Sequence, residues 1–385
     1  MLRKPCFSPS PCLRKIGLSD MAALLILLLL AALFFLQSFL YDKLWGKGLE
    51  TKITFREEYA TEDDTAVLTE VIVNDKLLPL PVVEIDFHMD KGLRFLGEAN
   101  TSVSDRSYRR DVFTLGPRQK ITRTLEFQCA RRGYYRIDQA GMDVRNLLLT
   151  KKYVGASRQD TDFYVLPRPV PAQRVQIPFS QIMGSVLSRK KVYDDPFEFA
   201  GLRDYARGDP MKYINWKASA KTGELLVNMH ESTLSQKVAV VVDLEGSGVQ
   251  QADPLNEEAV RIASTLCVRL LEAGVQVGAW SNGVDVLTGE PMAVPEASGQ
   301  GSVLALRKAF ACAKAANGLE PVENFLPSGE EDVLCVLVSR NQREELAKAF
   351  AEQAGKREWL QIVPYRESYQ ELPQFGCVHR LYWEI

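Results

Sequence analysis

The sequence predicts an α+β multidomain protein in which an N-terminal transmembrane helix precedes an antiparallel β-sandwich and a doubly wound α/β domain. Three observations carry this prediction. An apolar run occupies residues 21–40, short β-rich runs separated by turn residues fill residues 49–167, and strand-like and helix-like runs alternate over residues 236–385. The length of 385 residues is enough for two or three domains.

Composition argues against several classes of function. A net charge of -2 provides no basic field for nucleic acid. The three histidines, His88, His230 and His379, have no metal-ligand spacing, which argues against a zinc enzyme. No P-loop, G-x-S-x-G or G-x-G-x-x-G motif stands on a strand-to-helix turn, so we expect a protein that is not an enzyme. Seven cysteines without a C-x-x-C pair suit a reducing compartment.

The apolar run Met21–Leu40 is interrupted only by Gln37 and Ser38. Twenty helical residues reach about 30 Å, the thickness of the hydrocarbon core of a bilayer. A cleaved signal peptide is the alternative, but the run is longer than a typical signal core and no small-x-small site follows it. We therefore predict a single-pass membrane protein, with residues 1–20 as an N-terminal segment.

Basic residues flank the predicted span on both sides, so the positive-inside rule gives nearly equal support to either orientation. They are Arg3, Lys4, Arg14 and Lys15 before it, and Lys43, Lys47, Lys52 and Arg56 after it. If translation begins at Met21 rather than Met1, the leading group is lost and the following flank lies inside. The soluble domains would then be cytoplasmic, in agreement with the free thiols.

Residues 49–167 contain short runs rich in valine, isoleucine, threonine and aromatic residues. Turn residues separate these runs, among them Asn74-Asp75, Lys91-Gly92, Gly116-Pro117 and Arg132-Gly133. This spacing predicts an antiparallel β-sandwich. We interpret Arg131 and Arg132 as an edge-strand pair that limits aggregation, and binding to an acidic partner surface is the alternative.

Residues 168–235 are predicted to form a linker followed by a charged connector. Pro167, Pro169, Pro171 and Pro178 indicate an extended crossing between domains. Gly208-Asp209-Pro210 is strong turn chemistry, and the residues after Pro210 are predicted to open a short helix. The connector is either a binding segment or a solvated loop capped by a surface helix.

Lys237–Asp243, reading KVAVVVD, is a continuous apolar run that ends in an acid. Such a run is typical of a strand buried on both faces of a parallel sheet. Predicted helices follow at Leu255–Ala273, Gly301–Ala315 and Gln342–Gln353, and predicted strands at Val275–Trp280, Val333–Val338, Trp359–Val363 and Cys377–Trp383. Their alternation predicts a doubly wound α/β domain over residues 236–385.

One ordered motif resembles a known family. It reads Gly201-Leu202-Arg203-x-Tyr205-x-x-Gly208-Asp209, followed by Ile214-x-Trp216-Lys217-x-Ser219-Ala220. This pattern resembles the signature of a bacterial domain-of-unknown-function family, numbered fifty-eight. The resemblance is sharp only between roughly Asp195 and Asp243. It implies an immunoglobulin-like form for the β-sandwich, a von Willebrand A-like form for residues 236–385, and partnership with MoxR-type AAA+ ATPases.

The resemblance also implies a candidate metal loop at Asp243-Leu244-Glu245-Gly246-Ser247, beyond the carboxyl end of a strand. In von Willebrand A domains this loop reads Asp-x-Ser-x-Ser and supplies oxygen ligands to Mg²⁺. Asp243 and Ser247 match that pattern, whereas Glu245 stands in place of the first serine. Ser281 and Ser339 are further candidates by position only. The alternative is that Asp243 caps the turn that follows.

The expected function is that of a non-enzymatic, membrane-anchored adaptor or scaffold, acting with a MoxR-type AAA+ ATPase in complex assembly or maturation. Its expected docking surface combines the edge around Asp243 with the signature residues Arg203, Asp204, Tyr205, Gly208, Asp209, Trp216 and Lys217. Two alternatives remain: an outward-facing adhesion or cell-envelope assembly module, and an uncharacterised hydrolase.

Overall fold

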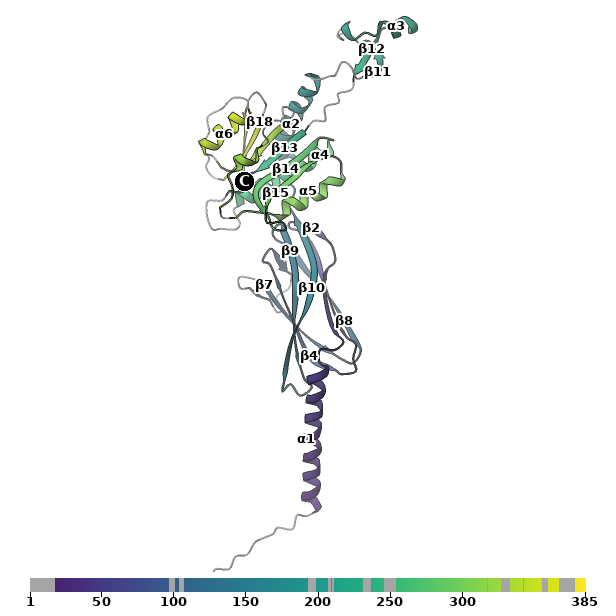
Figure 1. The fold of residues 1–385 in the computed structure, drawn as a ribbon, viewed down its shortest axis with the longest axis vertical. Helices are drawn as coiled ribbons and strands as arrows, with labels where there is room; N and C mark the ends of the chain where they lie inside the picture. Colours follow the sequence, from purple (N-terminus) through teal and green to yellow (C-terminus); the bar gives the residue numbers. More distant parts are fainter. Residues whose placement is uncertain are drawn as a thin grey trace, which may run out of the picture.

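The structure, a computed structural model, describes residues 18–385 apart from 97–100, 104–106, 193–198, 207–208, 210, 231–236, 246–253, 317, 327–332, 342, 355–358 and 367–377. Its parts follow one another along a single long axis (Figure 1). They are an N-terminal helix, a pair of β-sheets (the β part, residues 49–166), a mixed sheet with helices (the α/β part) and a small two-stranded unit. The predicted α+β class, with an apolar helix near the N-terminus, is confirmed.

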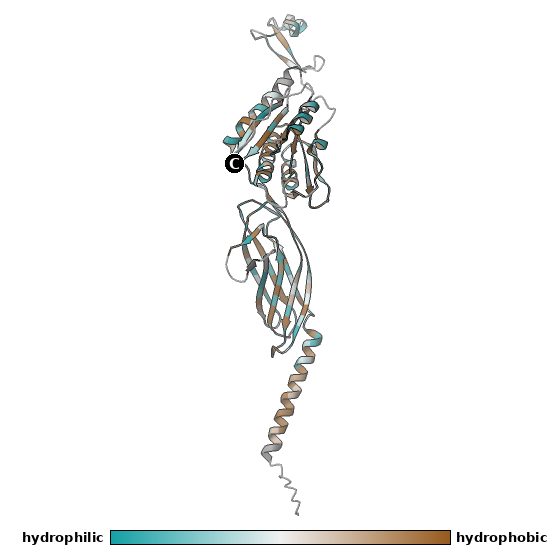
Figure 2. Cartoon of the chain, turned by 90° about the vertical axis from the view of Figure 1, so that its left-hand side faces the viewer, coloured by the Kyte–Doolittle hydropathy of each residue, from teal (hydrophilic) through white to brown (hydrophobic). Residues whose placement is uncertain are grey.

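Helix α1, Leu18–Leu44, is longer than the predicted span, and the window Met21–Leu44 is long and apolar enough to cross a membrane. Most of its leucines are exposed, and Figure 2 shows it as a hydrophobic rod outside the folded parts. Its last turn is different, because Tyr41 is buried in the core of the β part and its hydroxyl donates to the Pro79 carbonyl at 2.5 Å. Trp45 follows and stacks on Tyr153. The helix is therefore continuous with the fold that it precedes.

Two sheets form the β part. One has the strand order β1-β3-β8-β5 and the other β2-β10-β9-β4-β7-β6, and every pairing is antiparallel except that of β10 with β2. Their strands are β1 (Leu49–Phe55), β2 (Tyr59–Thr61), β3 (Thr65–Asn74), β4 (Leu80–Met89), β5 (Leu93–Phe95), β6 (Thr101–Val103), β7 (Ser107–Leu115), β8 (Gln119–Cys129), β9 (Gly133–Arg145) and β10 (Lys152–Leu166). Alternate side chains such as Leu68 and Ile72 of β3 and Phe87 of β4 meet in one core shared by both sheets.

The α/β part is built on a sheet of order β15-β14-β13-β17-β18-β19, with β16 paired to β14. Pairings between β13, β14, β17, β18 and β19 are parallel, whereas β15 and β16 are antiparallel to β14. The bounds are β13 (Lys237–Val242), α4 (Pro254–Glu272), β14 (Gln276–Asp285), β15 (Pro291–Ala297), α5 (Gly301–Cys312), β16 (Ala313–Lys314), η2 (Val322–Phe325), β17 (Val333–Val338), α6 (Glu344–Ala354), β18 (Trp359–Tyr365) and β19 (Val378–Glu384).

Both faces of this sheet are covered, which explains why its strands are continuously apolar. Val240 of β13 lies in the core that contains α4 and α5, whereas Val241 lies in the core that contains α6 and η2. The sequence located most of these strands and helices, but it missed β15, whose apolar pattern is weak and whose residues are mostly exposed. It also extended the predicted helix Gly301–Ala315 over β16, which pairs with β14.

Helix α2, Ala172–Val192, stands where the sequence predicted a linker. The helix begins directly after Pro171 and tolerates Pro178 in its interior. Val175, Ile182 and Val186 are buried in the core beside α4. Their spacing of seven and four residues places them on one helical face, and packing of that face outweighs the helix-breaking tendency of Pro178.

Arg132 joins the β part to the α/β part. Its side chain is 4% exposed, and its guanidinium donates to Glu257 of α4 at 2.7 Å and to the carbonyls of Phe310 and Ala313 at 2.6 Å each. Our interpretation of Arg131 and Arg132 as an edge-strand pair was therefore wrong for Arg132, which is buried and pairs with Glu257 of its own chain. Arg131 is exposed, as expected.

Glu62 is the acidic counterpart at the same junction. Arg261 of α4 donates to its carboxylate at 2.9 and 3.2 Å, and the backbone N–H groups of Arg132 and Arg168 donate at 3.1 and 3.0 Å. Burial alone would raise the pKa of Glu62, but these hydrogen bonds outweigh burial and the pKa is lowered. The two parts are thus connected through buried and half-buried charges that pair with one another.

Candidate functional site

The family-like motif folds into a small unit, which we call the signature module: β11 (Phe199–Asp204), η1 (Met211–Tyr213), α3 (Trp216–Thr222) and β12 (Leu226–His230). Strands β11 and β12 pair with each other antiparallel and form a separate two-stranded sheet. Figures 1 and 2 both show the module at the end of the molecule opposite α1.

Arg203 and Asp209 close the connection that follows β11. Their side chains form a two-point ion pair with both N–O distances at 2.7 Å, and Asp209 also accepts from the Ala206 N–H at 2.8 Å. The hydrogen bond from Arg203, with that from Ala206, lowers the pKa of Asp209 to about 2. This pair therefore orders the connection, and Asp209, the described residue of the predicted turn Gly208-Asp209-Pro210, has a structural role there.

A second group of motif residues holds α3 in place. Asn215 caps the helix by accepting from the Ala218 N–H at 3.0 Å, and Gly223 ends it with a φ of 82°. The Ser219 hydroxyl donates to the Asn215 carbonyl at 2.8 Å and accepts from the Leu226 N–H at 2.9 Å. Ile214 is buried. These positions are specified by the fold of the module itself.

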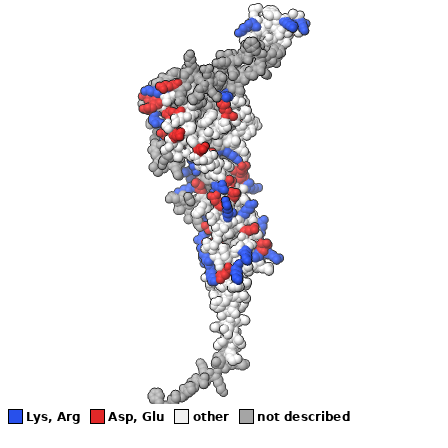
Figure 3. Space-filling view, viewed as in Figure 1, with Lys and Arg blue, Asp and Glu red and all other residues white. Residues whose placement is uncertain are grey.

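Other side chains of the module are left exposed. Trp216 is 61% exposed and Met211 68%, and Leu202 and Leu225 are also exposed. Lys217 and Lys221 lie four residues apart on α3 and are exposed, and Figure 3 shows lysine and arginine side chains on the visible face of the module. Tryptophan and methionine contribute much to protein interfaces and gain little from facing water.

The predicted docking residues thus divide into two groups. Arg203, Asp204, Tyr205 and Asp209 border the turn, and the backbone N–H of Tyr205 donates to the Leu225 carbonyl at 2.9 Å. Trp216 and Lys217 lie exposed on α3. Gly208 lies outside the described residues. The sequence analysis did not predict Met211 and Leu225 as docking residues. The signal that could have identified them is their position as apolar residues next to turn-forming and charged residues.

The loop after β13 brings together residues from three strands. Asp243 is fully buried, and its Oδ1 accepts from the Glu245 N–H and from Asn282 Nδ2, both at 2.9 Å. Its Oδ2 accepts from the Ser339 hydroxyl at 2.7 Å. Ser339, predicted by position, therefore reaches Asp243, whereas Ser281 accepts from the Gly283 N–H. Asn282 was missed, although Ser281-Asn282-Gly283 interrupts an apolar strand at its carboxyl end.

The described acidic side chains of this loop are engaged by other groups of the chain in the arrangement seen. Both oxygens of Asp243 already accept hydrogen bonds from protein groups, and Glu245 accepts from Arg343 at 2.7 Å and from Asn341 at 3.2 Å. Asp243 holds the turn, as the alternative interpretation expected. Ser247 lies outside the described residues, so the Mg²⁺ site stays a prediction.

The structure does not bring Asp243 and the signature module together. Asp243 follows the carboxyl end of β13, next to the start of α4, where Asn256 donates to the Leu244 carbonyl. That end of the sheet faces the β part, because Glu257 of α4 contacts Arg132. The module precedes the amino end of β13 and lies at the far end of the molecule (Figure 1).

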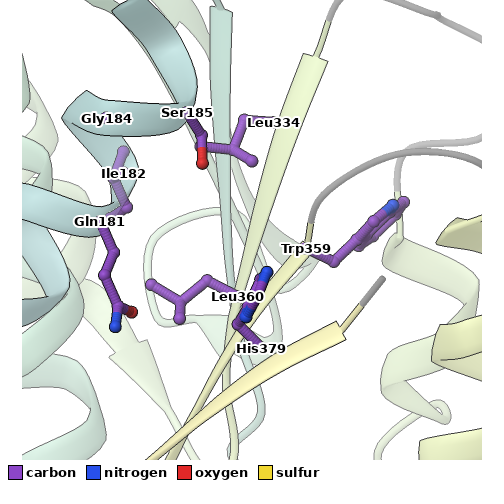
Figure 4. Close-up of a pocket in the computed structure, with 8 residues that line it drawn as sticks. All are labelled: Gln181, Ile182, Gly184, Ser185, Leu334, Trp359, Leu360 and His379. Carbon is purple, nitrogen blue, oxygen red and sulfur yellow. The ribbon is translucent and has the colours of Figure 1, made fainter. Parts of the chain in front are cut away.

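A cavity of about 300 Å³ lies between α2 and the amino ends of β17, β18 and β19 (Figure 4). Its polar lining comes from Gln181, Ser185 and His379. Figure 4 shows Trp359 pointing away from α2. No hydrogen bond between Ser185 and His379 is found among the described residues, and we assign no reaction to the cavity.

Comparisons with solved structures give matches to parts of the chain. The CARDB domain of a Pyrococcus furiosus protein is 13% identical, with a TM-score of 0.20, and the match covers 29% of this chain and 94% of that one. The major pilin SpaD of Corynebacterium diphtheriae is 15% identical, with a TM-score of 0.21, covering 29% and 34%. A non-cellulosomal cohesin of Archaeoglobus fulgidus is 8% identical, with a TM-score of 0.21, covering 30% and 91%.

No curated protein matches the chain. A family model does match, over residues 201–381, and its description is "Protein of unknown function DUF58". The matched range begins at Gly201, the first residue of the signature motif, and ends in β19. The match therefore supports the assignment of this C-terminal part of the chain to the DUF58 family.

Proposed function

We propose that the protein is a non-enzymatic, membrane-anchored adaptor that presents the signature module to a protein partner, a MoxR-type AAA+ ATPase, during complex assembly or maturation. The observation that carries the proposal is the exposure of Trp216 and Met211 on a separate two-stranded unit at one end of the molecule. A folded unit that keeps large apolar side chains in water is typical of a binding surface.

The anchor in this proposal is α1. Its apolar side chains are exposed along most of its length, and a lipid bilayer would cover them. A cleaved leader is the competing explanation for such a helix. Burial of Tyr41 in the core of the β part, and the stacking of Trp45 on Tyr153, favour a helix that is retained.

The folded parts act in this proposal as a spacer between anchor and module. We interpret the two packed sheets as an immunoglobulin-like β-sandwich and residues 236–385 as a von Willebrand A-like domain. Buried junction charges such as Arg132 and Glu62 would keep the two parts in a fixed relation. The buried free thiols of Cys129, Cys267, Cys312 and Cys335 suit the cytoplasmic side of the membrane.

The test uses the full chain in lipid nanodiscs and a purified MoxR-type ATPase from the same organism. We expect Trp216→Ala to weaken binding about tenfold or more, as truncation of a central aromatic anchor does. Leu202→Ala should weaken binding less. Leu287→Ala is the matched control, because Leu287 is an exposed leucine outside the module.

The proposal fails if the wild-type chain does not bind the ATPase, or if Trp216→Ala and Leu202→Ala bind as wild type does. A reporter that works on only one side of the membrane, fused after Ile385, gives the orientation. An outside signal would remove the ATPase from consideration and favour the envelope-module alternative.

A further inference from the structure

Four chain connections meet at the end of the β part where α1 ends. They are residues 45–48 before β1, 75–79 between β3 and β4, 116–118 between β7 and β8, and 146–151 between β9 and β10. Hydrogen bonds join them: the Asp75 N–H donates to the Gly48 carbonyl at 2.8 Å, and the Arg118 N–H to the Lys76 carbonyl at 3.0 Å. Lys151 Nζ donates to Asp42 of α1 at 2.9 Å. These turns therefore surround the last turn of the helix.

Two of these turns expose leucines. Leu77 is 70% exposed, and the consecutive Leu147, Leu148 and Leu149 are each slightly more than half exposed. Hairpin turns normally carry glycine, asparagine or aspartate, which favour water and tolerate left-handed backbone. Leu149 instead adopts a φ of 57°, a conformation unusual for a large side chain. Leu149 thus keeps an unfavourable backbone conformation in a turn that exposes three consecutive leucines.

Asn146 satisfies several polar groups of the same turn from within. Asn146 is fully buried, and its Oδ1 accepts from the N–H groups of Thr150 and Lys151 at 2.8 and 3.2 Å. The Leu149 N–H donates to the Asn146 carbonyl at 2.9 Å. Backbone groups with internal partners lower the cost of moving a turn out of water, so this turn is suited to an apolar environment.

Basic side chains surround the leucines. Those exposed at this end are Lys43, Lys47, Arg118, Lys120, Lys151 and Lys152. The nearby acids include Asp42, which pairs with Lys151, and Asp143, which pairs with Lys152. Trp45 and Tyr153 add a stacked aromatic pair beside the helix. Aromatic and basic residues around an apolar tip are typical of the interface between a bilayer and water, where anionic headgroups attract the positive charges.

We propose that these turns insert their leucines into the bilayer that α1 crosses, and that the basic side chains contact anionic headgroups. The proposal rests on the membrane anchoring in the proposed function, but not on its ATPase partner. The apolar window Met21–Leu44 has 24 residues and spans about 36 Å at 1.5 Å per residue, so its C-terminal end reaches the bilayer surface. Figure 2 shows α1 meeting this end of the β part, which places the turns at that surface.

Insertion at a second place beside the helix would restrict tilting of the β part. A single helix leaves its soluble part free to pivot about the point where it leaves the membrane. Leucines on the turns at 77 and at 147–149 add contacts on the bilayer beside that point. The β part would then be held in a fixed orientation on the membrane rather than swept over a wide volume.

The test uses the full chain in vesicles of phosphatidylcholine and phosphatidylglycerol, with single cysteines labelled by an environment-sensitive fluorophore. Leu148→Cys reports on the turn, and Leu96→Cys is the matched control, because Leu96 is equally exposed on the β part but close to β5, at the other end. Leu29→Cys reports on α1. The background replaces Cys6, Cys12 and Cys377 by serine, and the four buried cysteines stay.

Lipids with a spin label near the headgroup should quench most of the Leu148 fluorescence and leave Leu96 unchanged. The Leu148 emission should also shift to shorter wavelength, and more so as phosphatidylglycerol is increased. If a probe at Leu29 is quenched by deeper spin labels while Leu148 behaves as Leu96 does, the anchor holds and the insertion proposal is overturned. If the Leu29 probe is not quenched either, the anchor itself is wrong. Equal quenching at Leu148 and Leu96 indicates general adsorption and also overturns the proposal.

Discussion

The two ends of the β part use side chains in opposite ways. At the end near α4, charged residues that normally face water are buried: Arg132 is 4% exposed and Glu62 accepts four hydrogen bonds. At the end near α1, leucines that normally avoid water are exposed. Each end breaks the usual rule that apolar residues lie inside and charges outside.

This difference between the two ends indicates whether the partner of each surface belongs to the same chain. Buried charges are tolerated only where their partners are supplied, and at the upper junction these partners come from the same chain. Exposed leucines have no such partner within the described residues. The end of the β part near α4 is therefore a completed interface. At the end near α1, the partner that we propose for the leucines is the lipid bilayer.

The largest effect should come from breaking the completed interface. Arg132→Ala removes an almost fully buried donor from the half-buried Glu257 and from the carbonyls of Phe310 and Ala313. We expect a loss of about 3–5 kcal/mol in the free energy of unfolding, measured by denaturant titration in detergent micelles. Arg131→Ala is the matched control, because the neighbouring arginine is exposed.

The control should stay within about 0.5 kcal/mol of the wild type, as surface substitutions do. Limited proteolysis should also cut the Arg132→Ala chain faster between the β part and the α/β part. Equal stability of the two variants would mean that the junction is open in solution, and the contrast between the two ends would be lost.

A second prediction compares two buried carboxylates of the β part. Glu62 is fully hydrogen-bonded, whereas neither carboxylate oxygen of Glu70 has a hydrogen-bond partner among the described residues. Burial, with a smaller contribution from Asp111, raises the pKa of Glu70 from 4.5 to about 7, against the opposing charges of Arg123 and Arg109. The folded state therefore holds this proton more tightly than the unfolded state does.

The two carboxylates should affect the pH dependence of stability with opposite sign. Between pH 4.5 and 7 the stability contributed by Glu70 falls as pH rises, so Glu70→Gln should be more stable than the wild type at pH 8, by up to about 3 kcal/mol. At pH 4.5 Glu70→Gln and the wild type should be equally stable.

Glu62 has a lowered pKa, so it contributes stability above its unfolded pKa, and this stability is lost as the pH falls. Glu62→Gln should therefore be less stable than the wild type at pH 8. Thermal unfolding at several pH values separates these outcomes, and a Glu70→Gln variant that is destabilised at pH 8 would contradict the first.

The sequence predicted elements whose pattern is local. Val333–Val338 and Trp359–Val363 are strongly apolar, and the structure has strands at both. Prediction from the sequence failed where contacts with distant residues determine the local structure. Helix α2 forms despite Pro178 because α4 and the sheet bury one of its faces. Arg132 and its exposed neighbour Arg131 are the same residue type, and only the three-dimensional position of Glu257 distinguishes them.

The sequence located the candidate site but did not assign a role to each of its residues, because those roles also depend on three-dimensional contacts. The signature motif identified the module, but residues such as Asn215 and Ser219 serve its internal hydrogen bonds, and the pattern alone does not separate these from the exposed Trp216. The edge around Asp243 was expected to join the module, yet it lies at the other end of β13. Which strand end faces which domain is set by packing between domains, and a linear motif carries no information about it.

The smallest effect should come from the exposed end. Leu148→Gln should change the free energy of unfolding in detergent micelles by no more than about 0.5 kcal/mol, because the side chain makes few contacts within the chain. Leu68→Ala, which removes a fully buried leucine from the shared core, should cost about 2–5 kcal/mol under the same conditions. A loss at Leu148 close to that at Leu68 would show that the turn packs against protein, since an exposed tip has little to lose. A leucine that contributes little to folding stability, in a turn where Leu149 adopts a left-handed backbone, would agree with the proposed contact between this turn and the bilayer.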